Sequence, residues 1–443
     1  MKRTLPDPPY ATLEQGSLVS TAAPAPEQAR TRTRGFVIAW VFALLFYFLE
    51  YAVRSSPSVM IPQLSRTFHT TALGVTSILV FYYYTYSTVS LIAGATLDHL
   101  GAKRSVPVGA AILGFGCLLF SVPVVVAGDL GRLLQGAGSA FAFTGGVYLA
   151  TRGFSARRLA TAIGVTQCLG MLGGSVGQLA VAPMIEHGVG VKAFWIGLGV
   201  LCLMNALLLY AATPGERLAP DAARGGLGGW LRPYKIVFSN PQSWLCGIVA
   251  GLLFAPTTIG AMIWAVPVFE GDLQFSYRSA VVTASMVPLG WVIGSPLVGW
   301  VSDRIGRRKP VILGGAVLMA LSVAHMMYWP TLLQVEVSML VLGIASGAAM
   351  VPYSVIKEAN PDEVKGSATG AINFLVFSIT AAIGPLHAGV YGRTLATTTN
   401  HAEHFRTAGL FWIVCCAAAA LVSLLLRETG HASPGRTELS YET

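Results

Sequence analysis

The sequence has few charged residues. Only 11% of its 443 residues are Asp, Glu, Lys or Arg, and 54% are hydrophobic, whereas soluble proteins carry about 25% charged residues. A chain with so little polar surface cannot cover a globule in water. Apolar runs of roughly 20 residues, enough to cross about 30 Å of hydrocarbon, recur about twelve times. The composition therefore predicts an all-α multi-pass membrane protein, because a backbone in lipid must satisfy its own hydrogen bonds.

The sequence also lacks the patterns of an enzyme or a pump driven by ATP. Its six cysteines lie in apolar runs with neither paired nor metal-ligand spacing, which predicts packing residues and no metal site. No nucleophile constellation supports a polytopic membrane enzyme, and no phosphate-binding loop supports ATP as the energy source. We expect no cofactor, with a proton gradient as the driving force. The first 34 residues lack a compact apolar signal region, so the first span is expected to be a retained anchor.

The basic residues are not gathered into a patch, although the net charge is +9. Of the 29 Lys and Arg residues, 22 lie in the two tails and in one set of alternate connections. Five lie in the other set, and two lie inside apolar spans. This dispersal argues against nucleic acid as a partner. By the positive-inside rule both termini are cytoplasmic, and we expect a protein of a bacterial inner membrane that acts as a monomer in the lipid bilayer.

One charged stretch occurs twice. Gly94, Asp98 and Gly101 recur as Gly299, Asp303 and Gly306, each pair separated by 205 positions. In both copies an apolar run precedes the first glycine. The second glycine marks an expected turn, and basic residues follow it. Each half of the chain thus contains two helices joined by a short charged hairpin. Two such repeats predict a transporter with its substrate site between the halves.

The polar interruption in the middle divides the chain. We expect a cytoplasmic tail at 1–34, a six-helix bundle at 35–212, a cytoplasmic linker with an amphipathic segment at 213–240, a second six-helix bundle at 241–427 and a C-terminal tail at 428–443.

At these residues the chain resembles the major facilitator superfamily. The family signature Gly-x-x-x-Asp-(Arg/Lys)-x-Gly-x-(Arg/Lys)-(Arg/Lys) is complete at Gly299, while the copy at Gly94 has His99 in the basic position. A second signature, Arg-x-x-Gln-Gly-x-Gly-x-Ala, matches the segment from Arg132 to Ala140. The resemblance implies two six-helix bundles and alternating access. It also implies that the hairpins hold the cytoplasmic side closed, with the gating residues Gly94, Asp98, Gly101, Lys103, Arg104, Gly299, Asp303, Arg304, Gly306, Arg307 and Arg308.

Within that family, Tyr51-x-x-Arg54 followed by Ser58 and Pro62 is similar to the organic-anion symporter and sugar-phosphate permease branch. The branch's sugar-phosphate antiporters carry a second arginine on the seventh helix, and the span 243–269 has none. The resemblance therefore favours a carboxylate over a phosphate ester. The fifth helix also lacks the Gly-Pro dipeptide of drug/proton antiporters.

Two acid–base pairs lie inside predicted spans, where a charge costs roughly 2.5–3.5 kcal/mol at the centre. Glu50 and Arg54 are four residues apart on one helix face. They can simply neutralise each other, or Arg54 can reach the outer headgroups. In the functional interpretation, Arg54 grips an anionic substrate while Glu50 competes for it or carries a proton.

The second pair is Asp129 and Arg132 on the fourth span. The family resemblance implies that Arg132 takes part in proton coupling, with Asp129 as its protonatable partner. An ordinary acid at a helix start is the alternative for Asp129.

Further polar side chains are candidates for lining a substrate cavity. The second span contains a tyrosine cluster whose hydroxyls cannot all face lipid cheaply, so we expect Tyr84 or Tyr86 to line the cavity. Gln167 and Asn373 are candidates of the same kind.

These observations predict a proton-coupled symporter of a small organic anion. Two alternatives stay open: an exporter of a metabolite or drug with the same fold, and a transporter-like membrane sensor.

Overall fold

The computed structural model describes the backbone of residues 26–154, 156–215, 226–330, 332–361 and 364–430. Within those ranges, the side chains of residues 26–32, 98–99, 156–161, 226–231 and 365–366 are not described. Most of the predicted N-terminal tail (1–34) and most of the C-terminal tail therefore lie outside the described residues, whereas residues 26–34 form the start of the first helix.

The described residues form helices and no strands. The first half contains α1 (Pro26–Ser55), η1 (Ser56–Met60), α2 (Ile61–Thr67), α3 (Ala72–Leu100), α4 (Ala102–Phe120), α5 (Val125–Gly153), α6 (Ala156–Leu179), α7 (Val181–Glu186) and α8 (Val191–Ala212). The linker helix α9 (Gly226–Ser239) follows. The second half contains α10 (Pro241–Ala255), η3 (Pro256–Trp264), α11 (Ala265–Gly271), α12 (Tyr277–Ile305), α13 (Lys309–Tyr328), α14 (Val335–Ser346), η4 (Gly347–Met350), α15 (Val351–Glu358), α16 (Lys365–Thr397) and α17 (His401–Ser423).

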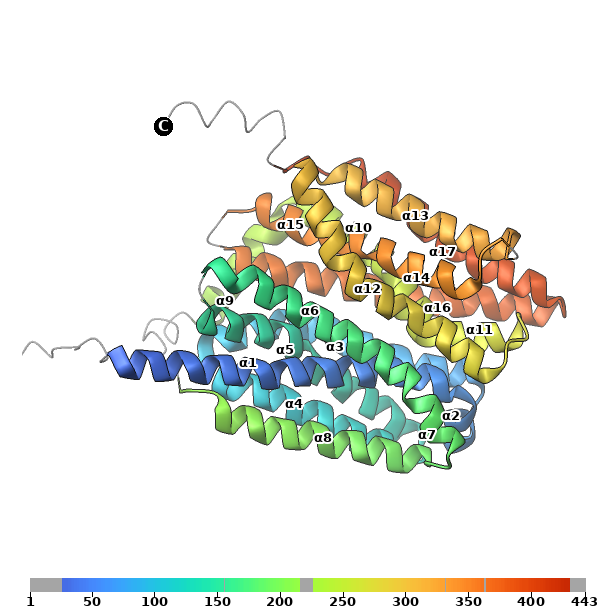
Figure 1. Ribbon diagram of the computed structural model, residues 1–443, viewed down its shortest axis with the longest axis horizontal. Helices are drawn as coiled ribbons and strands as arrows, with labels where there is room; N and C mark the ends of the chain where they lie inside the picture. Colours follow the sequence, from blue (N-terminus) through green and yellow to red (C-terminus); the bar gives the residue numbers. More distant parts are fainter. Residues whose placement is uncertain (1–25, 155, 216–225, 331, 362–363, 431–443) are drawn as a thin grey trace, which may run out of the picture.

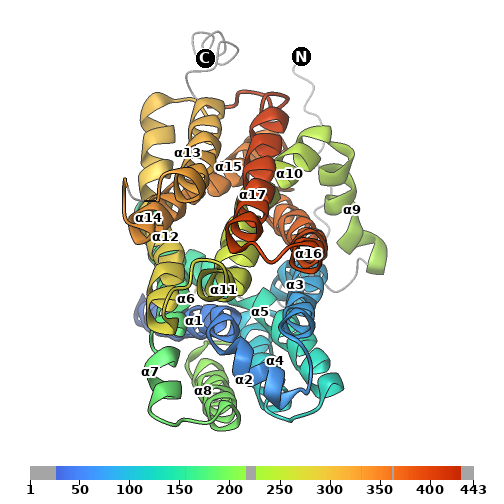
Figure 2. The ribbon, with the colours of Figure 1, turned by 90° about the vertical axis from the view of Figure 1, so that its right-hand side faces the viewer.

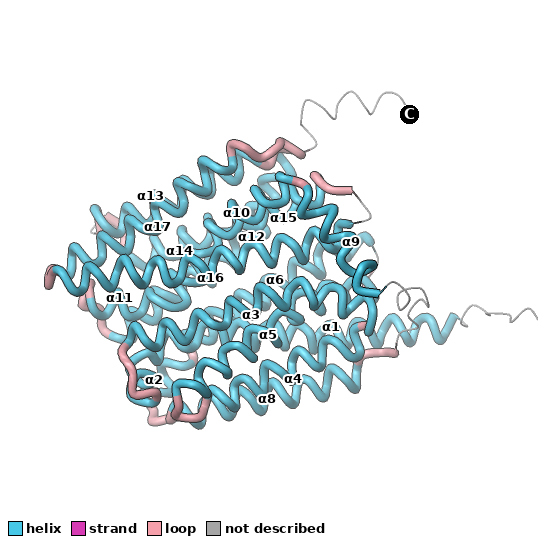
Figure 3. Tube along the Cα trace, turned by 180° about the vertical axis from the view of Figure 1, so that it is seen from behind, coloured by secondary structure: helices cyan, strands magenta, loops and turns pink. Residues whose placement is uncertain are grey.

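The two halves form two helical bundles side by side, with long helices running in one general direction (Figures 1 and 2). The connecting loops gather at the two ends of these helices (Figure 3). One end holds both repeated hairpins, at Gly101 and Gly306, and is called the hairpin end. The other, called the opposite end, holds the turns at His69 and Gln274. The predicted all-helical membrane fold is confirmed.

Eleven spans among the described residues are long and apolar enough to cross a membrane. Helix α5 is a further long helix, of 29 residues, whose apolar character is interrupted by Asp129, Arg132 and Gln135. The helix lies in the bundle interior, where the polar side chains of Arg132 and Gln135 are fully buried by neighbouring helices. Glycines on this helix allow those neighbours to come close. A Cβ added at Gly138 would lie 2.5 Å from backbone atoms of Gly109 and Leu113 on α4, so a larger residue would push α4 away.

The first span of each half is interrupted near the opposite end. Helix α1 passes into the 3-10 turn η1, which contains Pro57, and α10 passes into the π-helical segment η3, which begins at Pro256. Proline removes a helical hydrogen bond, which explains why regular helix ends there. The two irregular segments η1 and η3 pack against each other across the boundary between the halves.

Hydrogen bonds join the two halves at several levels, from the middle of the long helices to the opposite end of the molecule. The Ser87 hydroxyl on α3 lies 2.8 Å from the carbonyl oxygen of Phe374 on α16, and Ser175 on α6 donates to Ser285 on α12, also at 2.8 Å. At the opposite end the Tyr277 hydroxyl donates to the carbonyl of Val59. Closer to the hairpins, the linker helix α9 packs on α16, and its Tyr234 hydroxyl donates to the Leu91 carbonyl at 2.9 Å.

Candidate functional site

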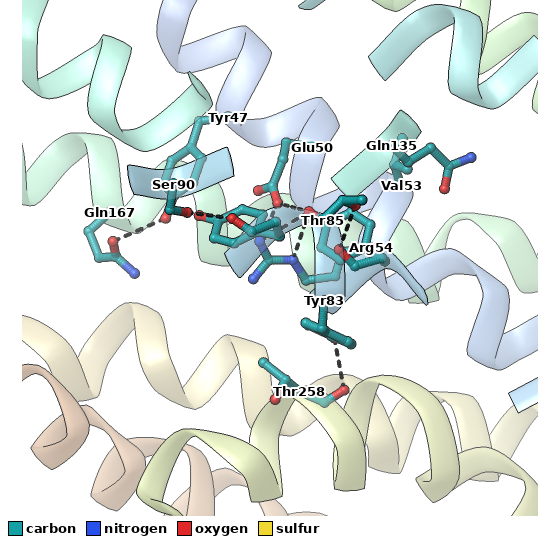
Figure 4. A network of polar contacts seen from close by, with 12 residues as sticks. Tyr47, Glu50, Val53, Arg54, Tyr83, Thr85, Ser90, Gln135, Gln167 and Thr258 are labelled. Atoms are coloured by element: carbon teal, nitrogen blue, oxygen red, sulfur yellow. Dashed lines mark hydrogen bonds and ion pairs between the residues drawn. The ribbon is translucent and has the colours of Figure 1, made fainter. Parts of the chain in front are cut away.

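The predicted pair of Glu50 and Arg54 lies fully buried on α1, facing α3. Arg54 Nη2 and the Tyr82 hydroxyl both donate to Glu50 Oε1. The same hydroxyl accepts from Arg54 Nε at 3.2 Å and Nη2 at 3.1 Å. Figure 4 shows Glu50 and Arg54 reaching toward each other in this network. Arg54 therefore points into the bundle and not toward headgroups at the membrane surface.

Aromatic rings surround the Arg54 guanidinium. Its Cζ atom lies 4.4 Å from the ring centre of Tyr51, 4.8 Å from Tyr86 and 5.2 Å from Phe377. Tyr82, at 5.1 Å, completes the near shell. Phe377 belongs to α16 in the second half, so the cage is built by both halves. A desolvated cation over an aromatic face gains about 2 kcal/mol, which helps to keep this charge inside the protein.

The pair leaves two buried polar atoms without a hydrogen-bond partner among the described residues: Arg54 Nη1 and Glu50 Oε2. An unpartnered buried donor or acceptor costs about 1–3 kcal/mol. One guanidinium nitrogen can therefore still donate to an acceptor, and one carboxylate oxygen can still take a proton. Mutual neutralisation alone does not account for both atoms.

A cavity lies beside this cage, between the halves. Its lining is mainly aromatic: Tyr47, Tyr51, Tyr86, Phe143 and Gln167 come from the first half, and Phe254, Met350, Tyr353, Asn373 and Phe377 come from the second. The two amides are held by neighbouring tyrosines. Tyr47 donates to Gln167 Oε1 at 3.3 Å, and Tyr353 donates to Asn373 Oδ1 at 2.7 Å. Three residues selected from the sequence, Tyr86, Gln167 and Asn373, thus meet around one space.

Tyr84 does not line this cavity. Its side chain is 41% exposed and lies at a separate pocket with Phe81 and Trp264. A position two residues from both Tyr82 and Tyr86 points to the other side of the helix, so only one face of the tyrosine cluster can reach the centre. Of the two tyrosines named as alternatives, Tyr86 lines this cavity and Tyr84 does not.

Arg132 is buried one layer away from Arg54. It donates to Gln135 Oε1 at 2.7 Å and to the Val53 carbonyl at 3.3 Å, and its Cζ lies 4.8 Å from the Tyr82 ring. Tyr82 therefore contacts both buried arginines, through its hydroxyl and through its ring. This layer ties α5 to α1 and α3.

The expected pairing of Asp129 with Arg132 is not formed. No ion pair joins them in the described part of the chain, and Asp129 Oδ1 has no hydrogen-bond partner there. The physical reason is that Gln135, one turn further along the same helix, takes the Arg132 guanidinium. Asp129 lies nearer the start of α5, towards the opposite end.

The two hairpins turn at glycines with positive φ, 74° at Gly101 and 68° at Gly306, a conformation that favours glycine. In the second hairpin, Arg308 Nη1 contacts Asp303 at 2.7 Å and Arg308 Nη2 contacts Glu358 on α15 at 2.8 Å. The Glu358 hydrogen bond raises the pKa of Arg308 above its ordinary value, so this guanidinium stays charged at physiological pH. Arg308 is the central cation of this hairpin.

The other basic residues of the two hairpins, as far as the structure describes their side chains, form no ion pairs like those of Arg308. Arg304 and Arg307 are exposed, and Arg304 lies over the Trp300 ring at 5.6 Å. In the first hairpin, Lys103 Nζ donates to the Thr213 carbonyl at 3.0 Å, and Arg104 is exposed. Side chains of Asp98 and His99 lie outside the described residues, while Gly94 and Gly299 lie within the last turns of α3 and α12.

The sequence interpretation missed several cage and cavity residues. Tyr47 and Tyr51 precede Arg54 by seven and three positions, a spacing that places all three on one helix face. That signal was available. Phe377 and Tyr353 carry no comparable signal, because an aromatic residue in an apolar span is usually packing and only the tertiary fold brings them to the first half.

This architecture defines a class. Two helical repeats with broken first spans, and a buried charged cage between them, are features of a secondary transporter. The chain belongs to the Major Facilitator Superfamily: its sequence matches the family model over residues 43–385 and again over 292–439. The family is one of membrane transporters and not of enzymes, and the resemblance based on the repeated hairpins is confirmed.

Individual relatives are distant. The chain is 26% identical over 182 residues to a D-xylose transporter of Levilactobacillus brevis, covering 41% of this chain and 36% of that protein. It is 27% identical over 152 residues to a galactose-proton symporter of Escherichia coli K12, covering 33% of this chain and 30% of that protein. These matches span about a third of each sugar transporter.

Two similarities extend over most of the chain. A membrane sensor protein of Salmonella typhimurium, UhpC, is 22% identical over 432 residues, which is 90% of this chain and 92% of that protein. The crystal structure of a bacterial homologue of the human lysosomal transporter Spinster, in an inward-facing and unoccupied conformation, has a TM-score of 0.66 at 14% identity. That similarity covers 88% of this chain and 97% of the other and shows the shared fold.

Proposed function

We propose that this protein is a proton-coupled transporter that carries a small organic anion by alternating access. The observation that carries the proposal is the free Nη1 of Arg54, a buried donor on a permanent positive charge beside an aromatic cavity between the halves. A guanidinium presents a rigid fork that matches a carboxylate. Small organic acids with an apolar or hydroxylated body suit the tyrosines and amides around it.

Glu50 links the anion to a proton. While its carboxylate holds Arg54, the cation is already paired and an incoming anion must compete. A proton on Glu50 removes that competitor and leaves a buried guanidinium in need of a counter-ion, which is a costly state. The anion then supplies the negative charge. Proton and monocarboxylate thus enter the site together, and the net charge of the site stays the same.

The same site can alternate between the two sides of the membrane because both halves build it. Phe377 from α16 closes the cage from one side, and Tyr51 and Tyr86 close it from the other. Rocking one bundle against the other would open the cage to one side at a time. We place the hairpin end in the cytoplasm of a bacterial cell, with one chain in the inner membrane as the working unit and the proton gradient as the only energy source.

Transport by purified protein in lipid vesicles tests this proposal. With an inward proton gradient, we expect uptake of at least one member of a panel of carboxylates, sugar acids, amino acids and nucleosides, and we expect it among the acids. A protonophore should abolish accumulation above equilibrium. Uptake that persists unchanged when the gradient is collapsed would contradict proton coupling, and uptake confined to neutral sugars would contradict the role of Arg54.

A second candidate function is a membrane sensor, favoured by the similarity to UhpC over nearly the whole chain. A sensor would bind its ligand in the same cage without carrying it across. Thermal stabilisation by an acid from the panel, combined with no uptake of that acid into vesicles, would support the sensor over the transporter.

A further inference from the structure

Three side chains with metal-binding atoms converge at the opposite end of the second half. Asp272 follows α11, and His401 and His404 lie in the first turn of α17. Asp272 Oδ1 is 3.1 Å from His404 Nδ1 and 3.7 Å from His401 Nδ1. The three candidate ligand atoms all lie within 4.8 Å of one another. This cluster is separate from the cage around Arg54 and has no part in the proposed transport.

The surroundings of His404 indicate that a cation belongs between these side chains. His404 Nε2 lies 2.9 Å from the carbonyl oxygen of Thr398, so Nε2 must carry the hydrogen. In the neutral ring Nδ1 then holds a lone pair, directed at a carboxylate oxygen 3.1 Å away. Two electron-rich atoms at that distance need a positive charge between them, either a proton or a metal ion.

The second shell favours the metal ion. A metal-bound histidine usually donates its other ring nitrogen to a carbonyl or carboxylate, and a metal-bound carboxylate is itself hydrogen-bonded. Both conditions are met: Thr398 holds Nε2 of His404, and the Tyr391 hydroxyl donates to Asp272 Oδ2 at 2.7 Å. These contacts leave Nδ1 and Oδ1 as the two inward-facing ligand atoms.

The two separations from the Asp272 oxygen also fit tetrahedral zinc. Bonds of about 2.0–2.2 Å to nitrogen and oxygen place neighbouring ligands of a tetrahedron about 3.3 Å apart, and the two observed distances of 3.1 and 3.7 Å lie on either side of that value. Two imidazole ligands suit zinc and related transition metals, whereas Mg²⁺ prefers a shell made of oxygen ligands only. His401 is 58% exposed, which gives an ion a path from solvent and a fourth position for water.

We infer that Asp272, His401 and His404 form a binding site for Zn²⁺ or a chemically similar divalent transition metal. The ion ties the end of α11 to the start of α17. Helix α11, which precedes Asp272, also packs against η1 of the first half.

Zinc binding to purified full-length protein without a polyhistidine tag tests this inference. After dialysis against ZnCl2 at pH 7.5, we expect about one zinc per chain by elemental analysis and little competition from Mg²⁺. Asp272→Asn and His401→Ala should each weaken binding by about a hundredfold. Tyr391→Phe keeps all three ligands and should weaken binding by about tenfold to a hundredfold through the outer shell. Binding should also weaken as the pH is lowered, because protons compete with the metal for its ligand atoms.

His187→Ala is the matched control. His187 is an exposed histidine at the same end of the molecule, outside the cluster, and its replacement should leave zinc binding unchanged. His401→Ala alters a side chain that is mostly in solvent and should fold normally, so loss of zinc there is a loss of a ligand. Retention of no zinc by the wild type, or equal zinc in wild type and His401→Ala, would overturn the inference.

Discussion

Replacing Arg54 with lysine is expected to lower uptake of the anion by about a hundredfold or more. Lysine keeps the charge but offers a compact ammonium in place of a planar fork. It therefore cannot bind the substrate carboxylate through two parallel hydrogen bonds. Loss of a hydrogen bond to a charged group costs up to about 3 kcal/mol, and each 1.4 kcal/mol is a tenfold change in affinity. Initial uptake rates in vesicles, at matched protein content, give the comparison.

Arg393→Lys is the control for this substitution, because Arg393 is an exposed arginine near the end of α16 and should tolerate lysine. Arg54→Ala is informative as a second variant, since it leaves Glu50 buried without its cation and should need a proton on Glu50 to remain folded. Uptake at the wild-type rate by both Arg54 variants, with normal amounts of folded protein, would refute the role of Arg54 as the anion receptor.

Replacing Glu50 with glutamine is expected to separate exchange from accumulation. Glutamine resembles the protonated acid in size and cannot release a proton, so Arg54 stays available for the anion through the whole cycle. Exchange of labelled for unlabelled anion across the vesicle membrane should continue within about threefold of the wild type. Accumulation driven by a proton gradient should fall at least about tenfold, because nothing in the site now titrates with the substrate.

A matched control is Glu403→Gln, which alters an exposed acid at the start of α17 and should preserve accumulation. The informative quantity is the ratio of accumulation to exchange, since a general loss of folded protein lowers both. If Glu50→Gln still concentrates the anion as the wild type does, the proton must be carried elsewhere.

Local patterns in the sequence predicted part of this site. The Glu50–Arg54 pair follows from two charges one helical turn apart inside an apolar run, and the two bundles follow from the hairpin repeated at an interval of 205 residues. For Asp129 and Arg132, helical spacing shows which side chains can meet but does not show that Gln135 competes for the Arg132 guanidinium.

Contacts between distant segments were beyond such patterns. Phe377 reaches Arg54 only because α16 packs on α3 across the two halves. Asp272 meets His404 across 132 positions of chain, so no metal-ligand spacing is visible in the sequence. Tyr84 shows a different difficulty. The sequence does not show which side of the helix faces the centre of the protein, so it could not show which tyrosines of the cluster line the cavity.

The most direct test of the account is the number of protons taken up when the anion binds. An acid that stabilises the purified protein would be added in weakly buffered detergent solution, with the pH change recorded and calibrated. The account predicts uptake of about one proton for each anion bound by the wild type, and none for Glu50→Gln. Binding of the anion with no proton uptake by the wild type, or with unchanged uptake in Glu50→Gln, would contradict the coupling of Glu50 to the anion at Arg54.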